Sequence, residues 1–221
     1  MVWIEGMAPL VRLDVWSDYV CPFCYLEEPV LTRILDEFGN DVNVNWQAFE
    51  LRPEPVPTLD PDGEYLHRVW NASVYPMASE RGMNLKLPPV QPRSRRAFEL
   101  TEFARDKGRF DETHRALFKA FFEEGKDISD LGVLGEIAEL VGLDPEEAKT
   151  AIELGTHRKR VIDQERRATA LGIRAVPTIL LSIPGMPFEN TAMLSGAQPH
   201  EAVKSAVHQA MEQARRELQA S

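Results

Sequence analysis

The chain contains only two cysteines, Cys21 and Cys24, and they stand three residues apart in Cys21-Pro22-Phe23-Cys24. Two cysteines placed at random in a chain of this length would have that spacing in about one chain in a hundred. Two thiols one helical turn apart can close a short disulfide and reopen it by exchange with another thiol. The pair therefore predicts a redox-active site.

A metal site is the first alternative to this interpretation. Zinc would need two further ligands, but the sequence has no third cysteine and its five histidines are scattered, so we predict no metal. A pair of inert buried cysteines is the plain structural alternative. An iron–sulfur site shared by two chains has less support than zinc, and a single nucleophilic cysteine has no local support.

The elements around the pair indicate how it would be positioned. Val11–Ser17 alternates apolar and polar residues and predicts a strand, and a helix is predicted from the cysteine motif to Phe38. The unpaired N–H groups and the positive end of that helix would favour a thiolate at Cys21. Pro22 suits the first helical position because it has no N–H to leave unpaired. We therefore expect an exposed, attacking Cys21, with Cys24 one turn behind it.

A proline directly before a predicted strand is a second unusual feature. Pro177 follows Val176 and precedes the strand Thr178–Ser182. Proline cannot join a central ladder unless its position is special, and a cis peptide is one reason for such a position, although trans is the commoner state. Together with the cysteine motif, this turn is more specific than either feature alone.

The remaining pattern predicts a sheet domain interrupted by helices. A second strand over 42–49 completes a β-α-β unit with a parallel crossover, and a proline-rich connector occupies 51–61. The further predicted elements are helices at Glu64–Arg81, Ser94–Lys107, Asp111–Glu124, Asp130–Val141, Asp144–Gly155 and Thr156–Leu171, a weak strand at Thr191–Leu194 and a helix at Pro199–Leu218. Thr156 is the expected N-cap of its helix.

Composition limits the partners. A net charge of −10 and a pI of about 5.1 argue against nucleic acid, because phosphate binding needs concentrated lysine and arginine. The sequence has no apolar window long enough for a membrane helix, so we expect no membrane contact. The start has no basic region followed by a long apolar run, which predicts a cytoplasmic location. Residues 1–9 are interpreted as a leader or a disordered segment.

Four sequence blocks together resemble the DsbA family of the thioredoxin-like superfamily. They are Asp18–Tyr25, Trp46–Pro53, Val176-Pro177-Thr178 and Ser195–Gln198. Their order, with helices between the second and third, is similar to the branch that includes FrnE-like proteins and 2-hydroxychromene-2-carboxylate isomerases.

This resemblance implies an α/β fold of the thioredoxin-like type, in which helices flank a central mixed β-sheet. A thioredoxin-like domain would then occupy 10–62 and 156–221. A helical insertion domain would occupy 63–155.

The resemblance also implies roles for individual residues. Cys21 would be the attacking thiolate and Cys24 the resolving thiol, with a catalytic cis-Pro177 packed beside them. The substrate-binding residues would be Pro22, Phe23, Val176 and Thr178, the backbone of Val176 pairing with a substrate peptide. The chain departs from the family pattern at Ala175, where glycine is common, and at Ile179, where phenylalanine often stands. Both departures would reshape the groove.

The activity implied is thiol–disulfide exchange, without a cofactor beyond the Cys21–Cys24 disulfide and with glutathione as a potential co-substrate. The partner would be a protein or small molecule that carries a thiol or a disulfide, and the chain would be a monomer or a homodimer. A reducing compartment favours a reductase or an isomerase of disulfides over net oxidation. Two alternatives stay open: a non-catalytic redox sensor, and a glutathione-dependent isomerase, although the isomerase relatives carry serine where Cys21 stands.

Several other side chains lie close to these motifs or suggest chemistry of their own. Asp18 and Glu50 are acids that could assist proton transfer to the resolving thiol. Tyr19 and Phe23 are expected to be exposed aromatic residues of a groove. His114 lies on the apolar face of its predicted helix, which favours a histidine that packs in the core over a catalytic base.

Overall fold

A computed structural model of the chain describes residues 9–186 and 191–220, so the predicted leader lies outside the described residues except for Pro9. The strands β1 (Val11–Ser17), β2 (Val42–Ala48), β3 (Thr178–Ser182) and β4 (Ala192–Ser195) form one sheet in the order β2-β1-β3-β4. β1 runs parallel to β2 and antiparallel to β3, and β3 runs antiparallel to β4. The sheet is therefore mixed, as the resemblance implies.

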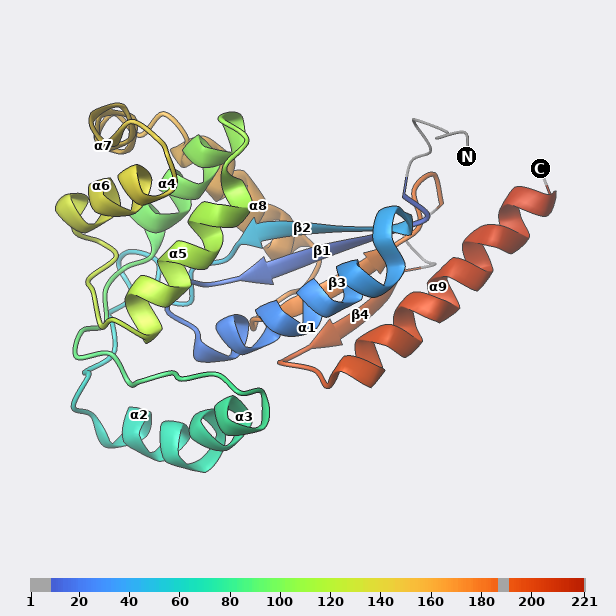
Figure 1. Cartoon of the computed structure of the whole chain (residues 1–221), viewed down its shortest axis with the longest axis horizontal. Helices are drawn as coiled ribbons and strands as arrows, with labels where there is room; N and C mark the ends of the chain where they lie inside the picture. Colours follow the sequence, from blue (N-terminus) through green and yellow to red (C-terminus); the bar gives the residue numbers. More distant parts are fainter. Residues whose placement is uncertain (1–8, 187–190, 221) are drawn as a thin grey trace.

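Helices cover both faces of this sheet (Figure 1). α1 (Pro22–Phe38) leads through the short turn η1 (Gly39–Asp41) into β2, and it packs with α9 (His200–Ala220) on one face. The segment between β2 and β3 contains α2 (Glu64–Val69), η2 (Trp70–Val74), α3 (Tyr75–Glu80), α4 (Arg95–Asp106), α5 (Phe110–Phe122), α6 (Leu131–Leu140), α7 (Pro145–Glu153) and α8 (Arg158–Ala170). α8 packs against β2 on the other face.

The central strand β1 is buried on both faces because each face has its own layer of helices. Leu13 and Val15 pack in an apolar cluster with residues of α1 and α9. Trp16 belongs to a second cluster that includes Leu100 on α4 and Phe118 on α5. This cluster continues without interruption from the sheet into the helical segment, so the two share one core, and the division into separate domains stays a prediction.

The predicted helix over 64–81 is one helical run with a π-helical turn, η2, in its middle. The N–H of Tyr75 donates to the carbonyl of Trp70, five residues earlier, rather than to the residue four before it. Pro76 follows at once, and a proline has no N–H and clashes with the carbonyl four residues before it. The wider π turn accommodates this proline, which the apolar period alone does not indicate.

The predicted N-cap at Thr156 is wrong, because this residue ends the preceding helix. Its N–H donates to the carbonyl of Ala151 at 3.0 Å, after Gly155 has adopted a positive φ of 64°. This closing turn is a common end of a helix. His157 is therefore the residue that precedes α8.

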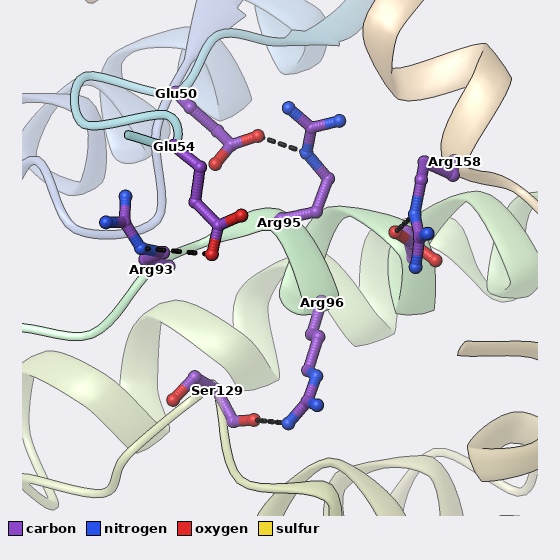
Figure 2. A pocket seen from close by; sticks show the side chains of 8 residues that line it. Glu50, Glu54, Arg93, Arg95, Arg96, Ser129 and Arg158 are labelled. Carbon is purple, nitrogen blue, oxygen red and sulfur yellow. Dashed lines mark hydrogen bonds and ion pairs between the residues drawn. The ribbon is translucent and has the colours of Figure 1, made fainter. Parts of the chain in front are cut away.

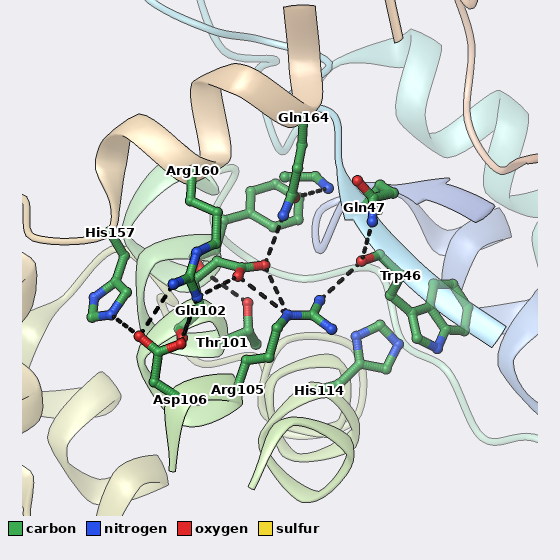
Figure 3. A network of polar contacts seen from close by, with 12 residues as sticks. Trp46, Gln47, Thr101, Glu102, Arg105, Asp106, His114, His157, Arg160 and Gln164 are labelled. Atoms are coloured by element: carbon green, nitrogen blue, oxygen red, sulfur yellow. Dashed lines mark hydrogen bonds and ion pairs between the residues drawn. The ribbon is translucent and has the colours of Figure 1, made fainter. Parts of the chain in front are cut away.

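A network of ion pairs around the buried Glu102 fastens α8 to α4 and to the end of β2 (Figure 3). Glu102 on α4 is buried and pairs with Arg105 and Arg160 at 3.2 Å each. The side chain of Gln164 on α8 donates to Glu102 at 2.9 Å and accepts from the N–H of Ala48 at 2.7 Å. Loss of either arginine would leave the buried Glu102 carboxylate with less compensation for its charge, and Gln164 links this carboxylate to the end of β2.

Candidate active site

Cys21 stands at the junction of the turn after β1 and the start of α1. Its backbone is extended, with φ −97° and ψ 113°, and its carbonyl accepts from the N–H of Cys24 at 3.1 Å. Pro22 is the first helical residue, as predicted. The thiol of Cys21 thus lies at the positive end of the helix dipole.

The segment around Pro177 lies directly against this thiol. The Val176–Pro177 peptide is cis, as the resemblance implies. The sulfur of Cys21 lies 3.6 Å from the carbonyl oxygen of Val176, and it can donate a hydrogen bond to that oxygen. The hydroxyl of Thr178 donates to the carbonyl of Ala175 at 2.8 Å, which braces the turn. The structure therefore brings together two segments that lie 155 residues apart in the sequence.

Cys24 is fully buried behind Cys21, and both thiols are free. The N–H of Asp18 donates to the sulfur of Cys24 at 3.4 Å. Burial raises the pKa of the Cys24 thiol well above its ordinary value, and the neighbouring Cys21 raises this pKa further. Cys24 therefore stays protonated at neutral pH and must lose a proton before it can attack.

Two predictions about exposure are wrong. Cys21 is only 5% exposed, and Tyr19 is 2% exposed instead of lining an open groove. The ring of Tyr19 packs on Phe98 of α4 and Phe118 of α5, with centroids 4.9 and 5.0 Å away. The helical segment covers this end of β1, and the local sequence pattern gives no signal of that packing. Phe23 is half-buried.

His114 on α5 is a core histidine, as predicted. It is buried, and its Nδ1 lies 2.9 Å from the hydroxyl of Tyr19. Burial lowers the pKa of His114 to about 3, so the ring is neutral at physiological pH. A neutral ring with so low a pKa is a poor general base.

The acids predicted near the site serve different purposes. Asp18 is fully buried, and its carboxylate accepts from the N–H of Leu51 at 2.7 Å and of Val20 at 3.3 Å. Burial raises the pKa of Asp18 to about 6. Its carboxylate thereby ties the active-site turn to the connector after β2, while its N–H contacts Cys24.

Glu50 belongs to a separate set of charges. Its carboxylate pairs with Arg95, which also pairs with Glu165 at 3.1 Å. Burial raises the pKa of Glu165 to about 7, and the charge of Glu50 raises it further. Glu50 is therefore held in a salt-bridge cluster, and its carboxylate is not directed at a thiol.

Glu50 and Arg95 of this cluster also line a cleft of about 570 Å³ (Figure 2). The lining residues are Glu50, Glu54, Arg93, Arg95, Arg96, Glu99, Ser129 and Arg158. Arg93 and Arg158 pair with Glu54 and Glu99, and Arg96 donates to the carbonyl of Ser129. Each guanidinium thus has an acceptor inside the cleft, and neither cysteine lines it.

Neither a metal cluster nor a membrane-spanning helix is found in the described part of the chain. Within residues 9–186 and 191–220, no three histidine, cysteine, aspartate or glutamate side chains gather where a metal ion could bind. Over the same ranges, no helix combines the length and the apolar composition needed to cross a bilayer.

Solved structures share this fold at low sequence identity. A probable DsbA oxidoreductase from Streptomyces coelicolor has a TM-score of 0.74 at 24% identity, covering 90% of this chain and 89% of its own. A 2-hydroxychromene-2-carboxylate isomerase has a TM-score of 0.74 at 18% identity, with coverage of 95% and 99%. The cytosolic disulfide reductase DsbM from Pseudomonas aeruginosa, solved with GSH, has a TM-score of 0.64 at 18% identity, with coverage of 94% and 99%.

Sequence similarity gives the family. The YwbO protein of Bacillus subtilis (strain 168) is 37% identical over 186 residues, which cover 79% of this chain and 90% of that protein. Residues 12–208 match the family described as DSBA-like thioredoxin domain, and this range holds both cysteines and Pro177. The chain therefore belongs to the DSBA-like thioredoxin domain family.

Proposed function

We propose that the chain is a thiol–disulfide oxidoreductase in which Cys21 attacks and Cys24 resolves. The observation that carries this proposal is the 3.6 Å distance from the Cys21 sulfur to the Val176 carbonyl oxygen. It sets a thiol at a helix start against the cis-Pro177 segment, where a substrate backbone would pair with Val176. Pro22, Phe23 and Thr178 would complete the contact with substrate.

The exchange has two steps. The thiolate of Cys21 attacks one sulfur of the substrate disulfide, so a mixed disulfide forms and the other substrate sulfur leaves as a thiolate. Cys24 then loses its proton, which the first substrate thiolate takes up, and attacks the Cys21 sulfur, which releases the second substrate thiolate and closes the Cys21–Cys24 disulfide. The substrate gains two electrons and the cysteine pair loses two. A thiol donor of low molecular weight, such as glutathione, would reduce the pair again.

We propose a cytoplasmic location, and the direction of the exchange follows from it. In a cytoplasm held reducing by glutathione, net reduction or isomerisation of disulfides is favoured over their formation. The fold likeness to DsbM, which was solved with GSH, supports glutathione as a co-substrate. The substrate would be a protein or a small disulfide, and no metal takes part. Exchange is favoured over glutathione-dependent isomerisation because this chain has a thiol at residue 21.

Steady-state reduction of a cystine-bridged peptide with glutathione as the electron donor tests the proposal. We expect Cys21→Ser to lower kcat/KM by at least a hundredfold, because serine cannot form a mixed disulfide. The control is Arg33→Lys, which replaces an exposed residue on the same helix and should retain wild-type turnover. A Cys21→Ser protein that keeps the wild-type rate would overturn the proposal.

A further inference from the structure

Glu27 is a buried acid on the helix that carries the cysteines. It lies three residues after Cys24, and its side chain has no exposed surface. Its Oε2 accepts from the N–H of Gln198 at 2.8 Å and lies 3.4 Å from Arg81 Nη1. Its Oε1 is buried and has no hydrogen-bond partner among the described residues. A carboxylate in such a place costs stability, so its presence calls for an explanation.

Arg81 reaches this acid from the end of α3, in the helical segment. Its side chain is 15% exposed, and its two terminal nitrogens hold different parts of the fold. Nη1 donates to the carbonyl of Leu26 on α1, and Nη2 donates to the carbonyl of Gln198 at 2.8 Å. The planar guanidinium can bridge two segments in this way with a fixed geometry, which a lysine cannot reproduce.

Gln198 lies in the short loop 196–199 between β4 and α9, and this loop continues the connection to the active site. The side-chain amide of Gln198 donates to the carbonyls of Ser195 at 2.8 Å and Gly196 at 3.1 Å. The N–H of Gly196 then donates to the carbonyl of Pro177 at 2.8 Å. Gly196 has a φ of 80°, a conformation that other residues rarely adopt.

These contacts form a closed path around the site. The path leads from α1 through Glu27 and Arg81 to Gln198, and from Gly196 to Pro177. It returns to the start of α1 through Val176, whose carbonyl faces the sulfur of Cys21. Glu27 and Arg81 touch neither thiol. They connect α1, which carries Cys21 at its start, with the Val176–Pro177 segment, and a substrate backbone would lie between these two parts.

We propose that Glu27 and Arg81 are positioning residues, which hold the Val176–Pro177 segment at the distance from Cys21 that a substrate disulfide requires. This inference rests on the proposed function, because it assigns the pair a role in binding the substrate of that reaction. The helical segment would then help to position the substrate, since Arg81 stands at the end of α3.

The test compares Arg81→Lys and Glu27→Gln with Arg33→Lys, which alters an exposed ion pair on α1. Reduction of a cystine-bridged peptide should show a KM raised at least fivefold in both test variants, with kcat within threefold of wild type. Carbamidomethylation of Cys21 by iodoacetamide, a small reagent that does not pair with the Val176 backbone, should stay within twofold of the wild-type rate. Hydrogen exchange of the Gly196 amide should accelerate at least tenfold, because its acceptor Pro177 is no longer held.

Three other outcomes are informative. Unchanged hydrogen exchange of the Gly196 amide would overturn the inference, since the loop would then not depend on Glu27 and Arg81. Faster hydrogen exchange of this amide with an unchanged KM would also overturn the inference, because Glu27 and Arg81 would then contribute to stability alone. If the wild-type protein has no thiol–disulfide exchange activity, the proposed function is contradicted instead. This result is obtained before any variant is made, so the two failures can be told apart.

Discussion

The sulfur of Cys21 lies 3.6 Å from the carbonyl oxygen of Val176, although the two residues are 155 positions apart in the chain. β1 and β3 are hydrogen-bonded neighbours in the sheet, so the turn that follows β1 and the turn that precedes β3 meet at one sheet end. The antiparallel pairing of these strands, with Trp16 opposite Thr178, fixes this approach. The site is therefore built by the sheet, and the cysteine helix completes it.

The two thiols should differ strongly in reactivity. Cys24 is fully buried, and its pKa is raised well above the ordinary value by that burial, whereas Cys21 stands at the helix start. Iodoacetamide at pH 7 should therefore modify Cys21 at least about a hundredfold faster than Cys24. Peptide mapping by mass spectrometry measures both rates, and unfolded protein, in which both should react, is the control. Equal rates in the folded protein would show that the asymmetry is absent.

Asp18 should make the protein less stable as pH rises. Burial raises its pKa from 3.8 to about 6, so between these values the folded state holds a proton that the unfolded state has lost. The unfolding free energy should then fall by about 1 kcal/mol between pH 5 and pH 7. Asp18→Asn should remove this part of the pH dependence in urea unfolding of the reduced protein.

The exposed Asp62→Asn is the matched control for this experiment and should keep the full pH dependence. Because the replacement at residue 18 also alters the bond to Leu51, the comparison uses the change with pH and not the absolute stability. If the unfolding free energy of Asp18→Asn changes with pH by the same amount as that of wild type, Asp18 is already ionised in the folded state at pH 5.

The hydroxyl of Tyr19 should stabilise the fold through His114. Tyr19→Phe would leave the buried Nδ1 of His114 without its partner at 2.9 Å. An unsatisfied buried polar group costs about 1–2 kcal/mol, which corresponds to a melting temperature lower by roughly 2–8 °C in a chain of this size. Tyr65→Phe, at a tyrosine that is 54% exposed, should change it by less than about 1 °C. Equal melting temperatures for both variants would show that this hydrogen bond does not stabilise the fold.

Patterns that depend on neighbouring residues were readable in the sequence. The alternation over Val11–Ser17 and the run Thr178–Ser182 predict β1 and β3 with the bounds that the structure has. Pro22 and Gly39 mark the two ends of α1, because one residue suits the first turn and the other adopts a positive φ of 55°. The cysteine motif and the turn at Pro177 belong to this class too.

Features that depend on distant packing were not readable. Tyr19 looks like a groove residue locally, and its burial depends on α4 and α5, which come about 80 and 95 residues later. Arg81 and Glu27 are 54 residues apart, and nothing in either segment indicates that they meet around Gln198. The sequence suggested acids near the thiols, but it pointed to Asp18 and Glu50 and not to Glu27. Side chains that join separate elements need the assembled fold to be found.

The most direct test of the central claim traps the intermediate on Cys21. The Cys24→Ser protein, reduced and then incubated with glutathione disulfide or a cystine-bridged peptide, is digested without reductant and mapped by mass spectrometry. We expect one mixed disulfide at Cys21, whereas wild type should contain the Cys21–Cys24 disulfide and release two substrate thiols per chain. A Cys24→Ser protein with no adduct at Cys21 under either condition would show that Cys21 is not the attacking thiol.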